Sequence, residues 1–184
     1  MDDQAVRWVF GYGSLIWRPG FAYLHAAEAL LPGAHRALCI YSFRHRGTPD
    51  RPGLVFGLVR GGSCRGMAFA VPAEGWDEVH AYLAERELDR GVYRESMRPV
   101  RLASGETVPA LAFLVDEAHP QYAGRLDVAE QARLVRDGIG ESGPNPEYVL
   151  QTVAHLRRMG IRDRYLEELA ELLDGWDAPV VQSA

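Results

Sequence analysis

The chain has 184 residues, a hydrophobic fraction of 47% and a net charge of −5, which suits one domain, residues 1–184, with a core from about 7 to 174. The acidic balance argues against a nucleic-acid or anionic-membrane partner, and no apolar run approaches the roughly 20 residues of a membrane span. Every basic side chain except histidine is arginine, which excludes Schiff-base and pyridoxal-phosphate chemistry on lysine.

The first element, residues 8–17, is an apolar run of strand character that ends in a Gly-x-Gly-Ser turn. Two glycines at a strand end indicate a backbone requirement, because glycine accepts left-handed dihedrals and lets another group approach the main chain closely. The consecutive N–H groups of this loop can form a nest for an anion, and a plain glycine turn is the alternative. Ile16 stands where a dinucleotide fingerprint needs its third glycine, and the neighbours of Ser14 do not fit a nucleophile elbow.

The remaining elements follow in chain order. Runs of strand character cover residues 7–12, 37–42, 54–60, 65–71, 93–102 and 107–115, with tight turns expected at 61–63 and 104–106. Helical spacing runs from 73 to about 87, from Asp127 to about 137, from Asn145 to about 160, and from Asp163 to about 174. Asp127 and Asn145 are the expected N-caps, and Pro146 suits a first helical turn.

About six strands followed by helices indicate an α+β fold. We expect the sheet to close into a small mixed, largely antiparallel β-barrel flanked by helices, because closure removes exposed strand edges. The polar segment 45–53 is either a lid or a plain connection. Two separated cysteines and six scattered histidines show no metal-binding spacing, so no metal site is predicted.

The helix expected over 73–87 carries a carboxylate on its apolar face. Trp76, Val79, Leu83 and Glu87 share one narrow stripe, whereas Glu78 projects to the opposite, solvated side. Burial and the helix C-terminus both raise a carboxyl pKa, which would let Glu87 act as general base and then general acid. The alternative is a structural ion pair of Glu87 with Arg86, Arg90 or Arg94.

With these elements in hand, the sequence resembles the ChaC family of γ-glutamylcyclotransferases. The resemblance rests on separated motifs that occur in family order from about residue 8 to 169: residues 8–17, the segments 45–47, 52–53 and 62–66, residues 82–87 (Tyr-Leu-Ala-Glu-Arg-Glu), and residues 142–148 (Ser-Gly-Pro-Asn-Pro-Glu-Tyr). One departure is that a single glycine, Gly91, stands where the family often has two before the following tyrosine.

The resemblance implies a cyclotransferase fold and a cytoplasmic, cofactor-independent enzyme that degrades glutathione to 5-oxoproline and cysteinylglycine. It implies that Glu87 is catalytic. It also implies that the loop formed by Val9, Phe10, Gly11, Tyr12, Gly13, Ser14 and Leu15 binds the γ-glutamyl group, and that Tyr148 lines the pocket. Family members often have a second glutamate nine positions before the catalytic one, which is Glu78 here, but the helical projection favours a structural role for it.

The implied chemistry suits the residues found independently, because an α-amino group that attacks its own γ-carbonyl needs only one base and a group to hold the oxyanion. No obligate protein partner is evident. Two other functions remain open at this point. A cyclotransferase for other γ-glutamyl amino acids or amines would use the same residues, and a non-catalytic regulator of cation transport would have no use for an acid on a core-facing stripe.

Overall fold

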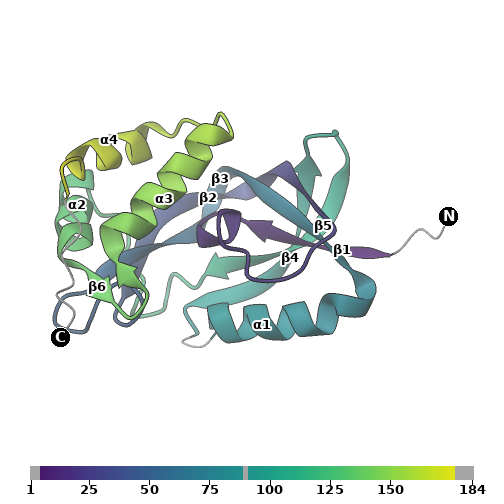
Figure 1. The fold of residues 1–184 in the computed structure, drawn as a ribbon, viewed down its shortest axis with the longest axis horizontal. Coiled ribbons are helices and arrows are strands. Elements are labelled where there is room, and N and C mark those ends of the chain that lie inside the picture. The colour runs from purple at the N-terminus through teal and green to yellow at the C-terminus, as the bar shows by residue number, and fades with distance from the viewer. Residues whose placement is uncertain (1–4, 89–90, 177–184) are drawn as a thin grey trace, which may run out of the picture. The chain divides into compact units, whose positions relative to one another are not determined.

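The computed structural model describes residues 5–88 and 91–176, and the chain divides into two compact units. Residues 1–39 and 56–124 form the first unit, which contains most of the strands and α1 (Figure 1). Residues 40–55 and 125–184 form the second unit, which contains α2, α3 and α4. That the whole chain behaves as one domain remains a prediction.

The strands form a closed barrel in the order β1-β3-β2-β4-β5. Their bounds are Val6–Gly11 for β1, His25–Ser42 for β2, Gly53–Pro72 for β3, Tyr93–Leu102 for β4 and Thr107–Val115 for β5. β1 runs antiparallel to β3, and β4 runs antiparallel to both β2 and β5. β5 is parallel to β1 and also pairs with β3 in parallel. The prediction of a mixed, largely antiparallel barrel in an α+β fold is confirmed.

The hairpin of β4 and β5 has the predicted bounds. Gly105 occupies the turn with a φ of +92°, which glycine adopts without a steric penalty. The amide of Leu102 donates to the carbonyl of Glu106 at 2.8 Å and closes the turn. Local turn chemistry was therefore enough to locate this hairpin.

The predicted hairpin at residues 61–63 is wrong, because β3 continues through this segment as one strand. Gly61 and Gly62 have φ values of +96° and +71°, so they do supply the unusual backbone that their sequence suggests. The strand does not end there because its neighbour in the barrel, β2, runs alongside. In β2 the Nδ1 atom of His35 lies 2.9 Å from the carbonyl oxygen of Gly61.

β2 is also much longer than the predicted strand over residues 37–42. It begins at His25 and passes through Pro32 and Gly33, the latter with a φ of +82°. A proline and a glycine normally argue against a strand interior. Here β2 lies between β3 and β4, and this pairing outweighs the weak local preference.

The helices follow their predicted positions closely. They are α1 (Trp76–Leu88), α2 (Val128–Asp137), α3 (Asn145–Arg158) and α4 (Arg164–Leu172), with a short 3-10 turn, η2 (Ala73–Gly75), before α1. The Asp127 carboxylate caps α2 by accepting from the amide of Glu130 at 2.8 Å, and Asp163 caps α4 in the same way. Asn145 is not an N-cap, contrary to the prediction, because its side chain forms tertiary hydrogen bonds instead.

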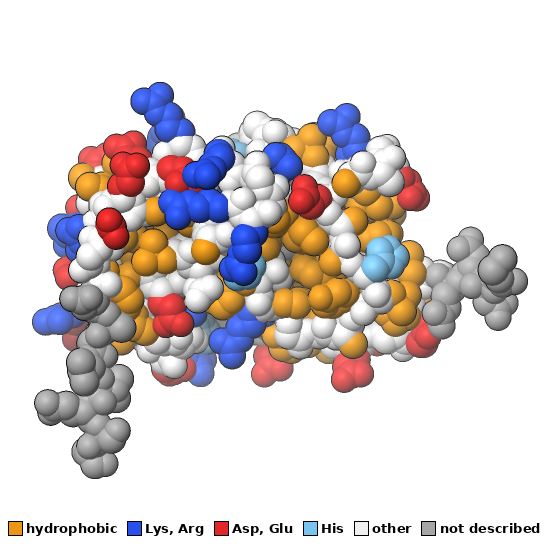
Figure 2. Space-filling model, turned by 45° about the horizontal axis from the view of Figure 1, so that its top comes forward, with side chains coloured by type: hydrophobic (Ala, Val, Ile, Leu, Met, Phe, Trp, Pro, Cys, Tyr) orange, Lys and Arg blue, Asp and Glu red, His pale blue; other side chains and the backbone are white. Residues whose placement is uncertain are grey.

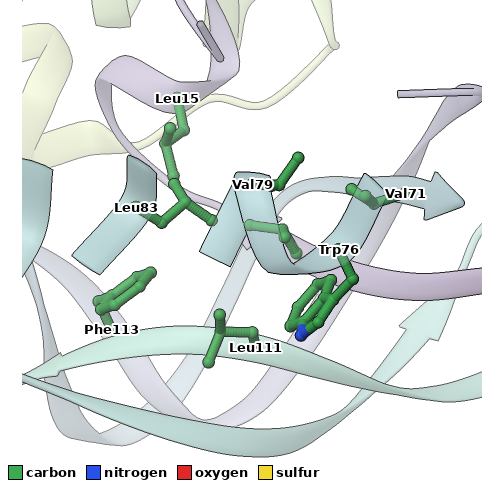
Figure 3. Packing of buried hydrophobic residues seen from close by; sticks show 8 residues of the cluster. Leu15, Val71, Trp76, Val79, Leu83, Leu111 and Phe113 are labelled. Carbon is green, nitrogen blue, oxygen red and sulfur yellow. The ribbon is translucent and has the colours of Figure 1, made fainter. Parts of the chain in front are cut away.

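The core of the first unit forms where α1 packs against the barrel. Figure 3 shows Trp76 and Leu83 of α1 next to Leu111 and Phe113 of β5, with Leu15 close to the same helix. Leu83 is fully buried and Trp76 is 8% exposed. This packing fixes which face of α1 points inward, and so it decides where the other side chains of the helix lie.

Both units carry exposed apolar side chains and exposed ion pairs. On the barrel unit, large apolar side chains such as Tyr23 and Leu24 are exposed, and Figure 2 shows hydrophobic side chains gathered there, at the right of the view. On the second unit, exposed charges form ion pairs such as Arg157 with Glu167 at 2.6 Å. No helix among the residues described is long and apolar enough to span a membrane.

Candidate active site

The predicted stripe on α1 is the buried face of that helix. Trp76, Val79 and Leu83 are at most 8% exposed, and the side chain of Glu87, which continues the stripe, is 15% exposed. Glu78 is exposed, in agreement with its projected place on the solvated side. The hydrophobic spacing of α1 therefore places the Glu87 carboxylate on the buried face of the helix and the Glu78 carboxylate on the exposed face.

The carboxyl group of Glu87 lies in an environment that favours its neutral form. Burial raises the pKa of Glu87 above the ordinary value of 4.5, and the positive charge of Arg86 acts in the opposite direction. The Nε atom of Arg86 is 3.4 Å from a carboxylate oxygen of Glu87. A carboxyl group held in this balance is suited to take up a proton and to return it.

The structural alternative for Glu87 is correct in one part, because Arg86 is indeed an ion-pair neighbour. Arg94 forms its ion pair with Asp116 instead, at 2.5 Å, and Arg90 lies outside the described residues. The pair with Arg86 does not cancel the effect of burial, since the pKa of Glu87 is still raised. An ion pair and a proton-transfer role are therefore compatible in this geometry.

Arg86 connects α1 to the segment that follows β1. One of its terminal nitrogens, Nη2, donates to the hydroxyl of Ser14 at 2.8 Å. The other, Nη1, donates to the carbonyls of Arg18 and Pro19 at 2.9 and 3.2 Å and to the hydroxyl of Tyr82 at 3.0 Å. The candidate acid/base and the predicted binding loop are thus joined through a single side chain.

The predicted loop lies at the end of β1. Val9, Phe10 and Gly11 belong to the strand and pair with β3, and the side chains of Val9 and Phe10 are fully buried. After Gly11 the chain leaves the sheet and forms the short 3-10 turn η1 (Ser14–Ile16). Val9 hence belongs to the same core cluster as Leu15, and residues 12–15 form the loop itself.

The loop presents backbone N–H donors that have no acceptor in the described part of the chain. Among the residues described, the amides of Gly13, Ser14 and Leu15 donate to no acceptor, whereas the amide of Ile16 donates to the carbonyl of Gly13 at 3.0 Å. Free N–H groups at the start of a helical turn carry partial positive charge and attract anions. This geometry agrees with the predicted anion nest.

The reason for the first glycine is close packing and not a left-handed backbone, since neither Gly11 nor Gly13 has a positive φ. A Cβ atom at position 11 would lie 3.0 Å from the Cβ of Leu15 and 3.0 Å from a ring carbon of Phe69. The loop can fold back over the strand end only because this space is empty. Of the two causes predicted for these glycines, close approach to the main chain applies at Gly11 and a left-handed backbone does not.

Tyr148 lies in the second unit, on α3, where it is 7% exposed. The guanidinium of Arg46 sits 5.3 Å from the centre of its ring, and Arg46 also donates to the carbonyl of Pro144 at 3.0 Å. The segments 45–47 and 142–148, which the resemblance singled out separately, therefore contact each other within this unit. The role of Tyr148 as a pocket residue stays a prediction.

The connection between β2 and β3, residues 43–52, contains most of the predicted polar segment 45–53 and is fixed by several contacts within the second unit. Arg44 forms an ion pair with Glu141 at 2.8 Å, and His45 is hydrogen-bonded to Ser142 at 3.1 Å. Their partners form the turn of a two-stranded sheet that consists of β6 (Ile139–Gly140) and β7 (Gly143–Pro144). The sequence did not predict this small sheet, and these contacts agree better with a fixed connection than with a lid.

Two residues make long-range contacts that could not be predicted from the sequence. Arg86 was considered only as an ion-pair partner of Glu87, although it also binds the loop. Asn145 was assigned to a helix cap, although its amide accepts from the Leu54 amide at 2.7 Å and donates to the Leu54 carbonyl at 2.8 Å. The family motifs contained both residues, but their partners are far away in the sequence.

Comparison with known proteins gives one family. A family model described as ChaC-like protein matches residues 7–175 of this chain. A glutathione-specific γ-glutamylcyclotransferase of Escherichia coli K12 is 32% identical over 167 residues, with 91% of this chain and 72% of the relative covered. The human glutathione-specific γ-glutamylcyclotransferase 1 is 32% identical, with 94% and 79% covered.

Solved structures show the same fold. The crystal structure of a selenomethionine-labelled γ-glutamyl cyclotransferase specific to glutathione from yeast superposes with a TM-score of 0.85, at 24% identity, and covers 94% of this chain and 97% of that one. A second crystal structure of such a yeast protein has a TM-score of 0.81 at 25% identity, with 92% and 98% covered. Both are similar over nearly their full length.

Proposed function

The chain belongs to the ChaC-like family, and from this premise we propose that it is a γ-glutamylcyclotransferase that cleaves glutathione to 5-oxoproline and cysteinylglycine. The observation that carries the proposal is the carboxyl group of Glu87, withdrawn from water on the core-facing side of α1 and joined through Arg86 to a loop with free backbone amides. The names of the relatives support the substrate.

The proposed reaction is intramolecular. The neutral α-amino group of the γ-glutamyl residue attacks its own γ-carbonyl carbon, so that a five-membered ring forms and the amide bond to cysteine breaks. The nucleophile is already tethered, and the enzyme has only to hold the chain in a folded, near-attack conformation. No electrons are exchanged with another reactant, and no metal or cofactor is required.

Glu87 moves the proton in this scheme. Its carboxylate takes a proton from the attacking amine, and the resulting carboxylic acid returns that proton to the leaving amide nitrogen of cysteine. The carboxyl group ends in its initial state, so a single residue serves both steps. The raised pKa of Glu87 supports this role, because the protonated intermediate form is then less costly to reach.

The loop at the end of β1 holds the group that gains negative charge. As the amine adds, the γ-carbonyl oxygen becomes an oxyanion, which preorganised backbone amides stabilise. The unused amides of Gly13, Ser14 and Leu15 are the donors for this purpose. Tyr148 is proposed as a further pocket residue, and the protein is proposed to act in the cytoplasm on this small-molecule substrate without an obligate partner.

The direct test is incubation of the purified protein with glutathione, followed by detection of 5-oxoproline. Glu87→Gln keeps the shape of the side chain but cannot cycle a proton, so turnover should fall by about 100- to 10,000-fold or more. Binding of glutathione and the thermal midpoint should survive this change. Glu78→Gln is the matched control, because it makes the same change on the exposed side of α1. Near-normal turnover by Glu87→Gln would remove the mechanism.

Substrate choice is tested with glutathione, γ-glutamylcysteine and γ-glutamylalanine. Contacts to the cysteinylglycine arm would help to hold the γ-glutamyl group in position, so truncated substrates should lose kcat as well as affinity. We expect the highest kcat/KM for glutathione. Equal values for all three compounds would instead indicate a cyclotransferase of broad specificity.

A further inference from the structure

Arg36 is a buried cation next to the glycine loop. It lies in β2 and is only 9% exposed. It shares one face of that strand with Ala34, Leu38 and Ile40, which are at most 1% exposed. Arginine is rarely buried to this extent unless its charge is paired or used.

The hydrogen bonds of Arg36 leave its charge uncompensated within the part of the chain that the structure describes. Its Nε donates to the carbonyl of Tyr12 at 2.5 Å, and its Nη2 donates to the carbonyl of Arg65 at 2.6 Å. Both acceptors are neutral. No carboxylate of the residues described forms an ion pair with Arg36, whereas Arg65 pairs with Glu28 at 3.3 Å and Arg86 lies beside Glu87.

One edge of the Arg36 guanidinium also has unused donors. The group carries five N–H donors, and its Nη1 atom makes no hydrogen bond to the described chain. Among the described residues, Nε of Arg98 is the only fully buried side-chain nitrogen or oxygen that lacks a hydrogen-bond partner. Since Nη1 of Arg36 lacks a partner too, it is not one of the fully buried atoms. The Nη1 edge of Arg36 is therefore not sealed inside the protein, and it remains accessible to water or to a ligand.

A buried guanidinium without a counter-ion is costly, and an anion that approaches its open edge offsets that cost. Carboxylates suit this edge well, because they match the planar fork of the guanidinium. The contact with Tyr12 places the cation directly at the loop proposed for the γ-glutamyl group. That group carries its own carboxylate, on the carbon that bears the attacking amine.

We propose that Arg36 binds the α-carboxylate of the γ-glutamyl substrate and so orients the adjacent amine for attack. The inference rests on the proposed cyclotransferase function and adds a residue that sequence motifs did not single out. Arg36 and the loop then have separate tasks: the guanidinium holds the α-carboxylate, and the amides of residues 13–15 remain available for the γ-carbonyl oxygen. Arg36 keeps its bonds to the two backbone carbonyls throughout.

Binding to the Glu87→Gln protein tests this proposal without turnover. Calorimetric titration would compare glutathione with γ-aminobutyryl-cysteinylglycine, which lacks only the α-carboxylate. Arg36→Met should weaken glutathione binding by about 10- to 100-fold, the usual range for a lost charge-assisted hydrogen-bond pair. The same substitution should leave the already weak binding of the decarboxylated analogue unchanged. Arg60→Met, at an exposed arginine of β3, is the control expected to change neither.

A purely structural role gives a different pattern. If Arg36 only clamps the carbonyl of Tyr12, Arg36→Met will weaken both ligands by the same factor, and the proposal fails. Glutathione with an esterified glycine carboxylate tests whether Arg36 binds the other carboxylate of the substrate. If Arg36→Met no longer affects binding of this ester, the guanidinium binds the glycine end, and the α-carboxylate assignment is overturned.

Two further measurements keep the outcome interpretable. Should Arg36→Met not fold, Arg36→Lys retains a positive charge without the fork, and it should bind glutathione with intermediate affinity while the analogue is unaffected. Failure of the proposed function looks different from failure of this inference. In the first case the unaltered protein makes no 5-oxoproline from glutathione; in the second it does, and the Arg36 variants bind glutathione as well as the parent.

Discussion

Arg86 is the residue through which the candidate acid/base and the glycine loop are connected. Its guanidinium reaches Glu87, Ser14 and Tyr82 at once, and it fixes the chain at two carbonyls after η1. Its charge favours the ionised form of Glu87, whereas burial favours the neutral form. Substitution can separate the effect of the Arg86 charge from the effect of its hydrogen bonds, because lysine keeps the positive charge but loses most of the hydrogen bonds.

We expect Arg86→Met to move the acidic limb of the kcat profile to higher pH, since the charge that holds the pKa of Glu87 down is removed. Loss of the contacts to the loop should also lower kcat by about 10- to 100-fold. Arg86→Lys should share the fall in kcat but keep the limb close to its original position. The measurement is kcat against pH for the three proteins. A common limb in the Met and Lys variants would contradict the electrostatic role.

The raised pKa of Glu87 also has a consequence for stability. In the folded protein the carboxyl holds its proton more tightly than in the unfolded chain, where its pKa is near 4.5. Above that pH the folded state therefore binds more protons, and the free energy of unfolding falls as the pH rises toward the folded-state pKa. The stabilisation that Glu87 contributes is therefore present at low pH and is lost as the pH rises.

Urea unfolding of the wild type and of Glu87→Gln across this pH range isolates the effect, because glutamine does not titrate. The wild-type free energy of unfolding, measured relative to the variant, should decrease as the pH rises above 4.5 and then level off. An increase over the same range would mean that the carboxylate is stabilised in the fold and that Arg86 outweighs burial.

At the level of elements, α3 is held by a side chain at its first position. Asn145 is fully buried, and its amide satisfies both the N–H and the carbonyl of Leu54 at the start of β3. A Cβ at Gly53 would lie 2.6 Å from the side-chain oxygen of Asn145, so the strand can approach this closely only at a glycine. The motif 142–148 thus attaches the helix to a strand far away in the sequence.

Asn145→Ala should lower the free energy of unfolding by roughly 2–4 kcal/mol, because it leaves two buried backbone groups without partners. Asp127→Ala is a useful comparison, since it removes an ordinary N-cap and should cost about 1 kcal/mol. Urea denaturation of both variants gives the two values. Equal, small losses would show that the two hydrogen bonds of Asn145 to Leu54 stabilise the fold no more than an ordinary helix cap does.

For the whole molecule, the open question is whether the two compact units unfold together. Strands β2 and β3 each contribute residues to both units, so neither unit contains either of these strands in full. Separation of the two would interrupt both strands. We therefore propose that residues 1–184 form one cooperative domain.

Differential scanning calorimetry of the wild type should show one transition, with equal calorimetric and van't Hoff enthalpies. Asn145→Ala, which acts in the second unit, should shift the entire transition to lower temperature. Two resolved transitions in the variant, of which only one has moved, would show that the units unfold independently.

Much of the fold could be predicted from local signals. The bounds of β4 and β5, the cap at Asp127, the start of the last helix at Asp163, and the buried stripe of α1 all follow from spacing and residue type within a short window. The stripe was sufficient to single out Glu87 and to separate it from Glu78, because helical periodicity alone decides which side chains share a face.

Tertiary structure decided the features whose partners lie elsewhere in the chain. Strand pairing extended β2 back to His25 and carried β3 through Gly61 and Gly62, against local preferences that indicated an end or a turn. Long-range contacts gave Asn145, Arg86 and Arg36 their partners. The sequence by itself thus determined the helices, the hairpin of β4 and β5, and the acid on α1, because these depend on near neighbours. The extent of the barrel strands and the arginines around the loop depend on groups that only folding brings within hydrogen-bond distance.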